Sequence, residues 1–178
     1  MTLVIASRSA SPPLMRLSAC LVSAAAWLGV LRFSGFYADS APHMFVSMVA
    51  GVSAFPALAA ALAIPKARIV TEGHLALVVV ILAAVIGAAI IIASGSRLFL
   101  NLTSLSAILL IAFVSFRARN TISGVSALVM LAGSLCFATK FSPAPMLQPA
   151  DILHLALAAG WLGIAARYRQ INRRCIVG

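Results

Sequence analysis

The chain has 178 residues, of which 63% are hydrophobic and only 9% are charged, and its mean hydropathy is +1.11. Soluble domains carry about 25% charged residues, so this composition excludes an ordinary globular domain and indicates a protein whose solvent is mostly lipid. The net charge of +10 comes from 13 basic and 3 acidic residues. Because the basic residues lie between apolar runs, they indicate membrane topology rather than nucleic-acid binding.

Residues 1–13 are polar and end in two prolines, and we expect a cytoplasmic N-terminal lead-in there. The apolar run that follows starts near one basic residue, Arg16, and contains small residues, which is also the pattern of a signal peptide. However, its apolar character continues to Tyr37, which gives it the length of a membrane span. We therefore predict a first transmembrane helix over 17–37 rather than a cleaved signal.

Five more apolar segments follow, separated by turn residues or basic loops. Within the second segment, Pro56 should kink the helix because its ring removes one backbone hydrogen bond. The predicted fold class is an all-α polytopic membrane protein, a bundle of about six transmembrane helices. We expect a single transmembrane domain over 14–169 and a basic cytoplasmic tail over 170–178. In chain order, the predicted helices cover 17–37, 42–64, 74–93, 98–116, 121–139 and 149–167.

The basic residues are shared unequally between alternate loops. Because the loops are short, consecutive helices should be antiparallel, and their ends should alternate between the two sides of the membrane. An excess of Lys and Arg marks the cytoplasmic side, so we predict that both termini are cytoplasmic, in a bacterial inner membrane. The ten basic residues of that side are Arg8, Arg16, Lys66, Arg68, Arg117, Arg119, Arg167, Arg169, Arg173 and Arg174, against Arg32, Arg97 and Lys140 outside.

Two Asp/His pairs fall at the predicted outer end of the bundle. Asp39 and His43 are four residues apart and Asp151 and His154 are three apart, so each pair can share one helix face. Each aspartate could accept one ring N–H of its histidine and leave the other ring nitrogen for a metal or a proton. The alternative is helix capping, because both aspartates stand where a helix begins and the helix dipole would stabilise their carboxylates.

If these pairs form a site, three chemistries compete. Haem b could be held between His43 and His154 if the two histidines face each other across the bundle. A divalent metal could instead be bound by both histidines together with Asp39 and Asp151. Metal-dependent hydrolysis would add Ser47 beside the metal, although only two histidines are available on that side for a metal.

Other polar residues could extend such a site or stand apart from it. Asn101 and Ser104 open the fourth predicted helix at the depth of Ser47, so a polar pocket at the outer ends of the second, fourth and sixth helices is possible. At the inner boundary, we expect Glu72 to be an ordinary loop acid beside a loop arginine and His74 to be an interfacial residue.

The sixth predicted helix carries small residues at two four-residue spacings. Ala156 with Gly160, and Ala159 with Gly163, match the pattern that lets helix backbones approach closely in membranes. We predict that this stripe packs inside the chain, against the second or the fifth helix, rather than forming a dimer face. Trp161 lies in the middle of the helix, so it should pack against a neighbour or face lipid rather than join an interfacial belt.

For function, we expect an accessory or structural subunit of a larger membrane complex, because the chain is small and has few buried polar residues. The first alternative is a metal- or haem-binding membrane protein that uses the Asp/His cluster. The second is a metal-dependent membrane hydrolase, for which the set of nucleophile, base and metal ligands is incomplete. The expected partners are the lipid bilayer, other membrane-protein subunits and anionic headgroups at the arginine tail.

Overall fold

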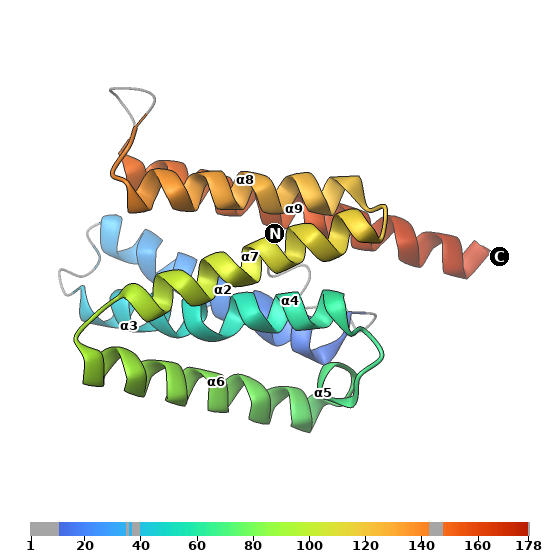
Figure 1. The fold of residues 1–178 in the computed structure, drawn as a ribbon, viewed down its shortest axis with the longest axis horizontal. Helices are drawn as coiled ribbons and strands as arrows, with labels where there is room; N and C mark the ends of the chain where they lie inside the picture. Colours follow the sequence, from blue (N-terminus) through green and yellow to red (C-terminus); the bar gives the residue numbers. More distant parts are fainter. Residues whose placement is uncertain (1–10, 35, 37–39, 143–147, 178) are drawn as a thin grey trace. The chain divides into compact units, whose positions relative to one another are not determined.

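The computed structural model describes residues 11–34, 36, 40–142 and 148–177. Every regular element in these ranges is a helix, which confirms the all-α prediction (Figure 1). In chain order, the elements are α2 (Pro13–Phe33), α3 (Ala41–Val49), the π-helical segment η1 (Ala50–Ala54), α4 (Phe55–Ala63), α5 (Arg68–Thr71), α6 (Gly73–Ser94), α7 (Leu98–Arg117), α8 (Thr121–Ala138) and α9 (Pro149–Val177).

Six stretches of the described residues are long and apolar enough to cross a membrane, as the hydropathy pattern predicts. The chain therefore has the architecture of a multi-pass membrane protein. The α6 helix shows the consequence most clearly, because Val85 is 60% and Ile92 is 73% exposed in the isolated chain. The six candidate spans are Pro13–Arg32, Ala41–Ala63, Gly73–Ser94, Leu98–Arg117, Thr121–Ala138 and Pro149–Ala166.

The first span is shifted from its predicted position. The α2 helix begins four residues earlier than predicted, with Pro13 in its first turn, where the missing proline N–H leaves no helical bond unmade. It ends at Phe33 rather than at residue 37. Ser34 is the C-cap, and its backbone N–H donates to the carbonyl oxygen of Val30 at 2.9 Å. Serine is a weak helix former and glycine, next in the sequence, is weaker still, so the helix stops before the apolar run does.

The last helix is longer than predicted. Instead of ending at residue 167, α9 continues to Val177 and includes the stretch 170–177 that we expected to be a separate basic tail. No proline or glycine interrupts the sequence from residue 164 to residue 177, so nothing in it ends the helix at the predicted membrane boundary. The membrane-crossing part, by length and composition, remains Pro149–Ala166.

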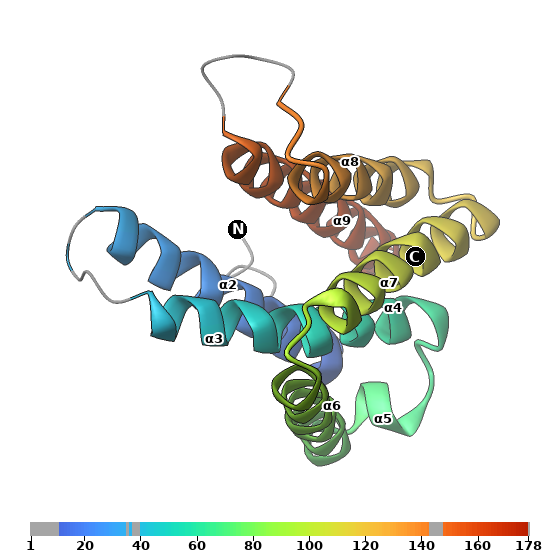
Figure 2. The same cartoon turned by 60° about the vertical axis from the view of Figure 1, so that its left-hand side comes forward.

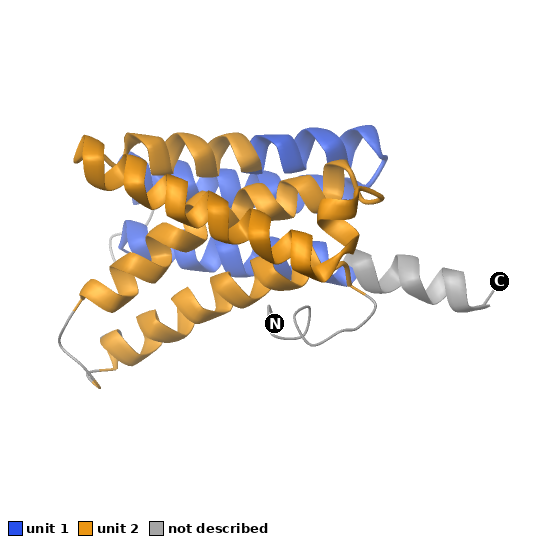
Figure 3. Ribbon diagram, turned by 90° about the horizontal axis from the view of Figure 1, so that it is seen from below, with its two compact units in different colours: residues 1, 108–178 blue, residues 2–107 orange. Residues whose placement is uncertain are grey.

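The chain divides into two compact units, where the sequence suggested one transmembrane domain over 14–169 (Figure 3). One unit, residues 2–107, contains α2 to α6 and the first half of α7, and the other is formed by residues 108–178 with Met1. The boundary falls inside α7, between Ala107 and Ile108. A single helix therefore contributes one half to each unit.

In the unit of residues 2–107, η1 lies between its neighbours, and α2, α3, α4 and α6 all contact it. The α2 and α3 helices lie side by side in both views of Figures 1 and 2. Fully buried side chains of this unit include Leu14, Leu58 and Val70. The short helix α5 contacts α2 and α6, so the loop between the second and third spans is folded back onto helices of its own unit.

In the other unit, α8 and α9 form an antiparallel pair that lies side by side in both views (Figures 1 and 2). Asn120 caps α8: its Oδ1 accepts the backbone N–H of Ser123 at 3.3 Å, and its Nδ2 donates to the Ser123 hydroxyl at 2.8 Å. An asparagine cap of this kind satisfies one of the backbone donors left unpaired at a helix start.

Candidate functional site

Of the predicted site residues, His43 lies in the first turn of α3 and is half buried. Its imidazole ring packs against Gly29 of α2, because a Cβ placed on Gly29 would lie only 3.1 Å from the ring atom Cε1. Gly29 thus leaves room for the ring between two neighbouring helices of one unit. The predicted partner Asp39 lies outside the described residues.

Asp151 adopts the capping arrangement that competed with a site. Its Oδ2 accepts the backbone N–H of Gln148, the N-terminal neighbour of α9, at 3.0 Å. This is the reciprocal half of a capping box, in which an acid in the first turn reaches back to an unpaired donor. His154, one turn further along, is exposed. The carboxylate of Asp151 is therefore bonded to backbone rather than to the histidine ring.

The proposed pairing of histidines stays a prediction, because His43 and His154 belong to different units. Within residues 11–34, 36, 40–142 and 148–177, no three His, Cys, Asp or Glu side chains come together to hold a metal ion. The metal set of His43, His154, Asp39 and Asp151 and the haem alternative are therefore carried by sequence spacing alone.

Ser104, predicted to line an outer polar pocket, instead contacts the π-helical segment η1 within its unit. Its hydroxyl donates to the carbonyl oxygen of Gly51 at 3.1 Å, while Asn101, one turn earlier, is exposed. All five residues of η1 are buried. The most deeply buried polar groups of this unit are thus found at an irregular helical turn, which the sequence interpretation did not single out.

Proline explains why this turn is irregular. Pro56 lies in the first turn of α4, directly after η1, at the position where the sequence predicts a kink. With the five-residue hydrogen-bond spacing of a π-helix, the N–H at position 56 would be the donor to the carbonyl of Gly51. Proline has no N–H, so the Gly51 carbonyl needs a donor from elsewhere. The Ser104 hydroxyl of α7 supplies it.

Two more serine hydroxyls bind carbonyls around the same turn. Ser18 of α2, which is fully buried, donates to the carbonyl oxygen of Ala54 at 2.6 Å. Ser53, 1% exposed, donates back to Val49 in its own helix at 2.6 Å. A buried carbonyl without a donor would cost about 1–3 kcal/mol, so these hydroxyls allow the irregular turn to exist away from water.

Small residues let neighbouring helices approach η1 closely. A Cβ on Gly51 would collide with the Leu100 side chain of α7, and a Cβ on Gly87 of α6 would lie 2.6 Å from the Val52 side chain. Both contacts are within one unit. The candidate functional site is therefore the serine-bonded π turn, defined here as η1 with Ser18, Ser53 and Ser104. Chemically it is a cluster of hydroxyls and carbonyls that joins α2 and α7 to one irregular turn, against which α6 packs through Gly87.

At the N-terminal end of α6, Glu72 is paired with Arg68, as the sequence predicts. Arg68 donates to both carboxylate oxygens, with Nη2 3.2 Å from Oε2, and His74 Nε2 lies 3.6 Å from the same Oε2. The Arg68 guanidinium lowers the pKa of the Glu72 carboxyl below its ordinary value of 4.5, and nearby His74 acts in the same direction. This exposed group ties α5 to the start of α6.

Of the predicted small-residue stripe, Ala156, Gly160 and Gly163 pack against α8, which selects the fifth helix of the two predicted partners, whereas Ala159 is exposed. A Cβ on Gly160 would collide with Met130 of α8, and a Cβ on Gly163 would collide with Ser126. From the α8 side, a Cβ on Gly133 would collide with Ala156. The glycines are therefore needed for close approach of the two backbones.

No protein-family model, curated protein or solved structure matches this chain. The functional conclusion therefore comes from the geometry of the described residues.

Trp161, which was predicted either to pack or to face lipid, is 2% exposed and therefore packs. Its indole Nε1–H is buried and finds no hydrogen-bond acceptor among the described residues. The indole contributes mainly apolar contact area at this position, which is how large aromatic side chains usually stabilise a helix interface.

Proposed function

We propose that this protein is a structural or accessory subunit of a larger membrane assembly. The observation that carries the proposal is the hydrogen bonding of three serine hydroxyls around η1, of which Ser18 and Ser53 are buried and Ser104 is half-buried. Ser18 of α2 and Ser104 of α7 donate to backbone carbonyls of η1, and Ser53 donates to a carbonyl of its own helix. These protons therefore bond to backbone rather than point toward a ligand. A chain whose buried polar groups stabilise its own packing is suited to act as a scaffold.

The wide apolar surface is consistent with this role, because helices of a subunit can be covered by lipid or by other subunits. We place the assembly in a bacterial inner membrane, with both termini in the cytoplasm, on the basis of the unequal distribution of Lys and Arg. A topology reporter fused after Ser94 should give the external signal and one fused after Asn120 the cytoplasmic signal. The same signal at both positions would contradict this orientation.

The subunit role is tested by purifying the chain, with an affinity tag, from its native membrane in a mild detergent. We expect a membrane protein of constant stoichiometry to co-purify, and we expect its abundance to fall when the gene for this chain is deleted. A chain that elutes alone, and whose deletion alters no other membrane protein, would contradict the proposal.

The same preparation separates the cofactor alternatives. A Soret absorbance band that disappears in a His154→Ala variant would support haem held by His43 and His154. Stoichiometric bound metal lost in the same variant would support the metal site, and hydrolysis that depends on that metal would support the membrane hydrolase. His74→Ala is the matched control. His74 is exposed at the start of α6, which the predicted orientation puts on the cytoplasmic side, whereas His43 and His154 are predicted on the outer side.

A further inference from the structure

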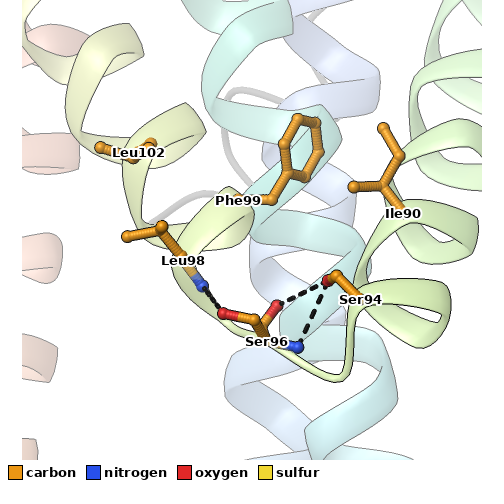
Figure 4. A pocket seen from close by; sticks show the side chains of 6 residues that line it. All are labelled: Ile90, Ser94, Ser96, Leu98, Phe99 and Leu102. Carbon is orange, nitrogen blue, oxygen red and sulfur yellow. Dashed lines mark hydrogen bonds between the residues drawn. The ribbon is translucent and has the colours of Figure 1, made fainter.

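A hollow of about 270 Å³ lies between the end of α6 and the start of α7, within one unit (Figure 4). Its walls are almost entirely apolar, and it is an open groove rather than an enclosed cavity. The residues that line it are Ile90, Ser94, Ser96, Leu98, Phe99 and Leu102.

The position of the hollow relative to the two spans identifies what can fill it. The α6 span ends at Ser94 and the α7 span begins at Leu98, so this turn lies at a membrane boundary. Ile90 and Leu102 are four residues further into their helices, which places them about 6 Å deeper, where lipid tails begin. Ile90, Leu98 and Leu102 are exposed in the isolated chain, so an open apolar groove at this depth can receive an acyl chain from the surrounding lipid.

The hydroxyls of the turn between α6 and α7, at one end of the hollow, are hydrogen-bonded within the turn itself. The Ser96 hydroxyl accepts the backbone N–H of Leu98 at 3.1 Å, and the Ser94 hydroxyl accepts the backbone N–H of Ser96 at 3.3 Å (Figure 4). Gly95 between them has a φ of +60°, the left-handed conformation that closes the end of α6. The turn is therefore a fixed rim, and its hydroxyls are already bonded within it.

Arg97 gives this rim its charge. In the sequence, Arg97 lies between the lining residues Ser96 and Leu98, and its side chain is exposed. Its Nη2 lies 3.9 Å from the sulfur of Met44 at the start of α3. In the part of the chain that the structure describes, no carboxylate pairs with it. A guanidinium has five N–H donors in a fork that matches phosphate oxygens. A cation at headgroup depth beside an apolar hollow is complementary to a lipid with an anionic head and an apolar tail.

We propose that this hollow binds one acyl chain of an anionic phospholipid whose phosphate is held by Arg97. With the predicted orientation, the lipid belongs to the outer leaflet. The proposal depends on membrane insertion and not on the role as a subunit. One basic residue near a membrane surface changes lipid binding by about fivefold, so this is the preference expected for phosphatidylglycerol over phosphatidylcholine.

The test is a lipid titration of the delipidated full chain in detergent, followed by native mass spectrometry. Phosphatidylglycerol and phosphatidylcholine with identical acyl chains are compared, with glycerol phosphate as the headgroup without a tail. We expect one tightly bound lipid, about fivefold tighter for phosphatidylglycerol, and no retained glycerol phosphate. Equal binding of the two lipids, or retention of glycerol phosphate alone, would overturn the proposal.

Two variants with matched controls localise the binding. Leu102→Trp fills the hollow and should weaken both lipids by about tenfold, whereas Leu82→Trp, on an exposed face of α6, should not. Arg97→Gln should abolish the preference for phosphatidylglycerol, because it weakens that lipid more than phosphatidylcholine, whose choline ammonium already offsets the phosphate charge. Arg117→Gln should preserve the preference. Because Leu102 and Arg97 are exposed, neither change disturbs the core. Identical titrations for Leu102→Trp and Leu82→Trp would refute the site.

Discussion

The serine-bonded π turn and the α8–α9 pair show two different ways to hold helices together in lipid. In the π turn, the helix is irregular, and hydroxyls from two other helices donate to carbonyls of the turn. In the α8–α9 pair, the two helices have no such irregular segment, and glycines let their backbones come close. Close approach at Gly51 and Gly87 also contributes to the π turn, so the first arrangement adds interhelical hydrogen bonds to close packing, whereas the second depends on shape.

The difference predicts how each region tolerates substitution. Lipid tails are as apolar as the helices, so burial of apolar surface gives little reason for helices to associate in a membrane. Close van der Waals contact and interhelical hydrogen bonds remain. A region that depends on contact should be sensitive to added atoms, and one that depends on hydroxyls should be sensitive to their removal.

The largest effect is expected for Gly160→Leu in α9. A Cβ at this position would lie 2.9 Å from the backbone carbonyl oxygen of Ser126 and would collide with Met130. Because the backbone cannot move aside as a side chain can, we expect a loss of about 3 kcal/mol in the free energy of unfolding. Unfolding in mixed micelles measures it. Ala159→Leu is the control, because Ala159 is the exposed neighbour of Gly160. An equal loss of unfolding free energy in this variant would contradict packing by shape.

The next effect concerns the coupling between Pro56 and Ser104. Ser104→Ala should cost about 1 kcal/mol of unfolding free energy, because the Gly51 carbonyl loses its donor. In a Pro56→Ala background, the restored backbone N–H can supply that donor, so the same change should cost close to nothing. A double-mutant cycle in detergent measures the coupling. If Ser104→Ala costs the same in both backgrounds, proline is not the reason for the serine bond.

A similar but uncoupled effect is expected for Ser18. Ser18→Ala removes a fully buried hydroxyl that bridges α2 to Ala54 of η1, and we expect a loss of about 0.5–1.5 kcal/mol. Ser134→Ala is the matched control, because its hydroxyl donates to Met130 in its own helix. Chemical unfolding should separate the two variants. A control that loses as much stability as Ser18→Ala would show that the interhelical bond has no special weight.

The smallest effect lies outside both regions, at Glu72. The folded pKa of its carboxyl is lowered, chiefly by Arg68, so the ion pair stabilises the fold above the unfolded pKa and this contribution is lost as the pH falls through the folded pKa. The thermal midpoint of Glu72→Gln should therefore lie below that of the wild type at neutral pH and converge with it as the pH falls through the lowered folded pKa. A difference that grows on acidification would reverse the assigned sign.

Much of the candidate site could not be predicted from the sequence. The Asp/His spacing permitted a ligand site as well as helix caps, and the structure shows Asp151 acting as a cap. The sequence predicted that Pro56 disturbs its helix. It could not predict which helix would supply the hydroxyl that bonds to the Gly51 carbonyl. Ser104 and Gly51 are 53 residues apart in the sequence, and no local pattern connects them.

The sequence alone determined the class of the protein, because the number and length of apolar runs follow from the requirement that every backbone group in lipid be bonded within a helix. It also determined the small-residue stripe of α9, because a four-residue spacing places these residues on one face. The tertiary structure decided which helix meets that stripe, where the second span becomes a π turn, and which hydroxyls complete it. Those outcomes depend on contacts between distant segments, and periodicity along one helix carries no information about its neighbour.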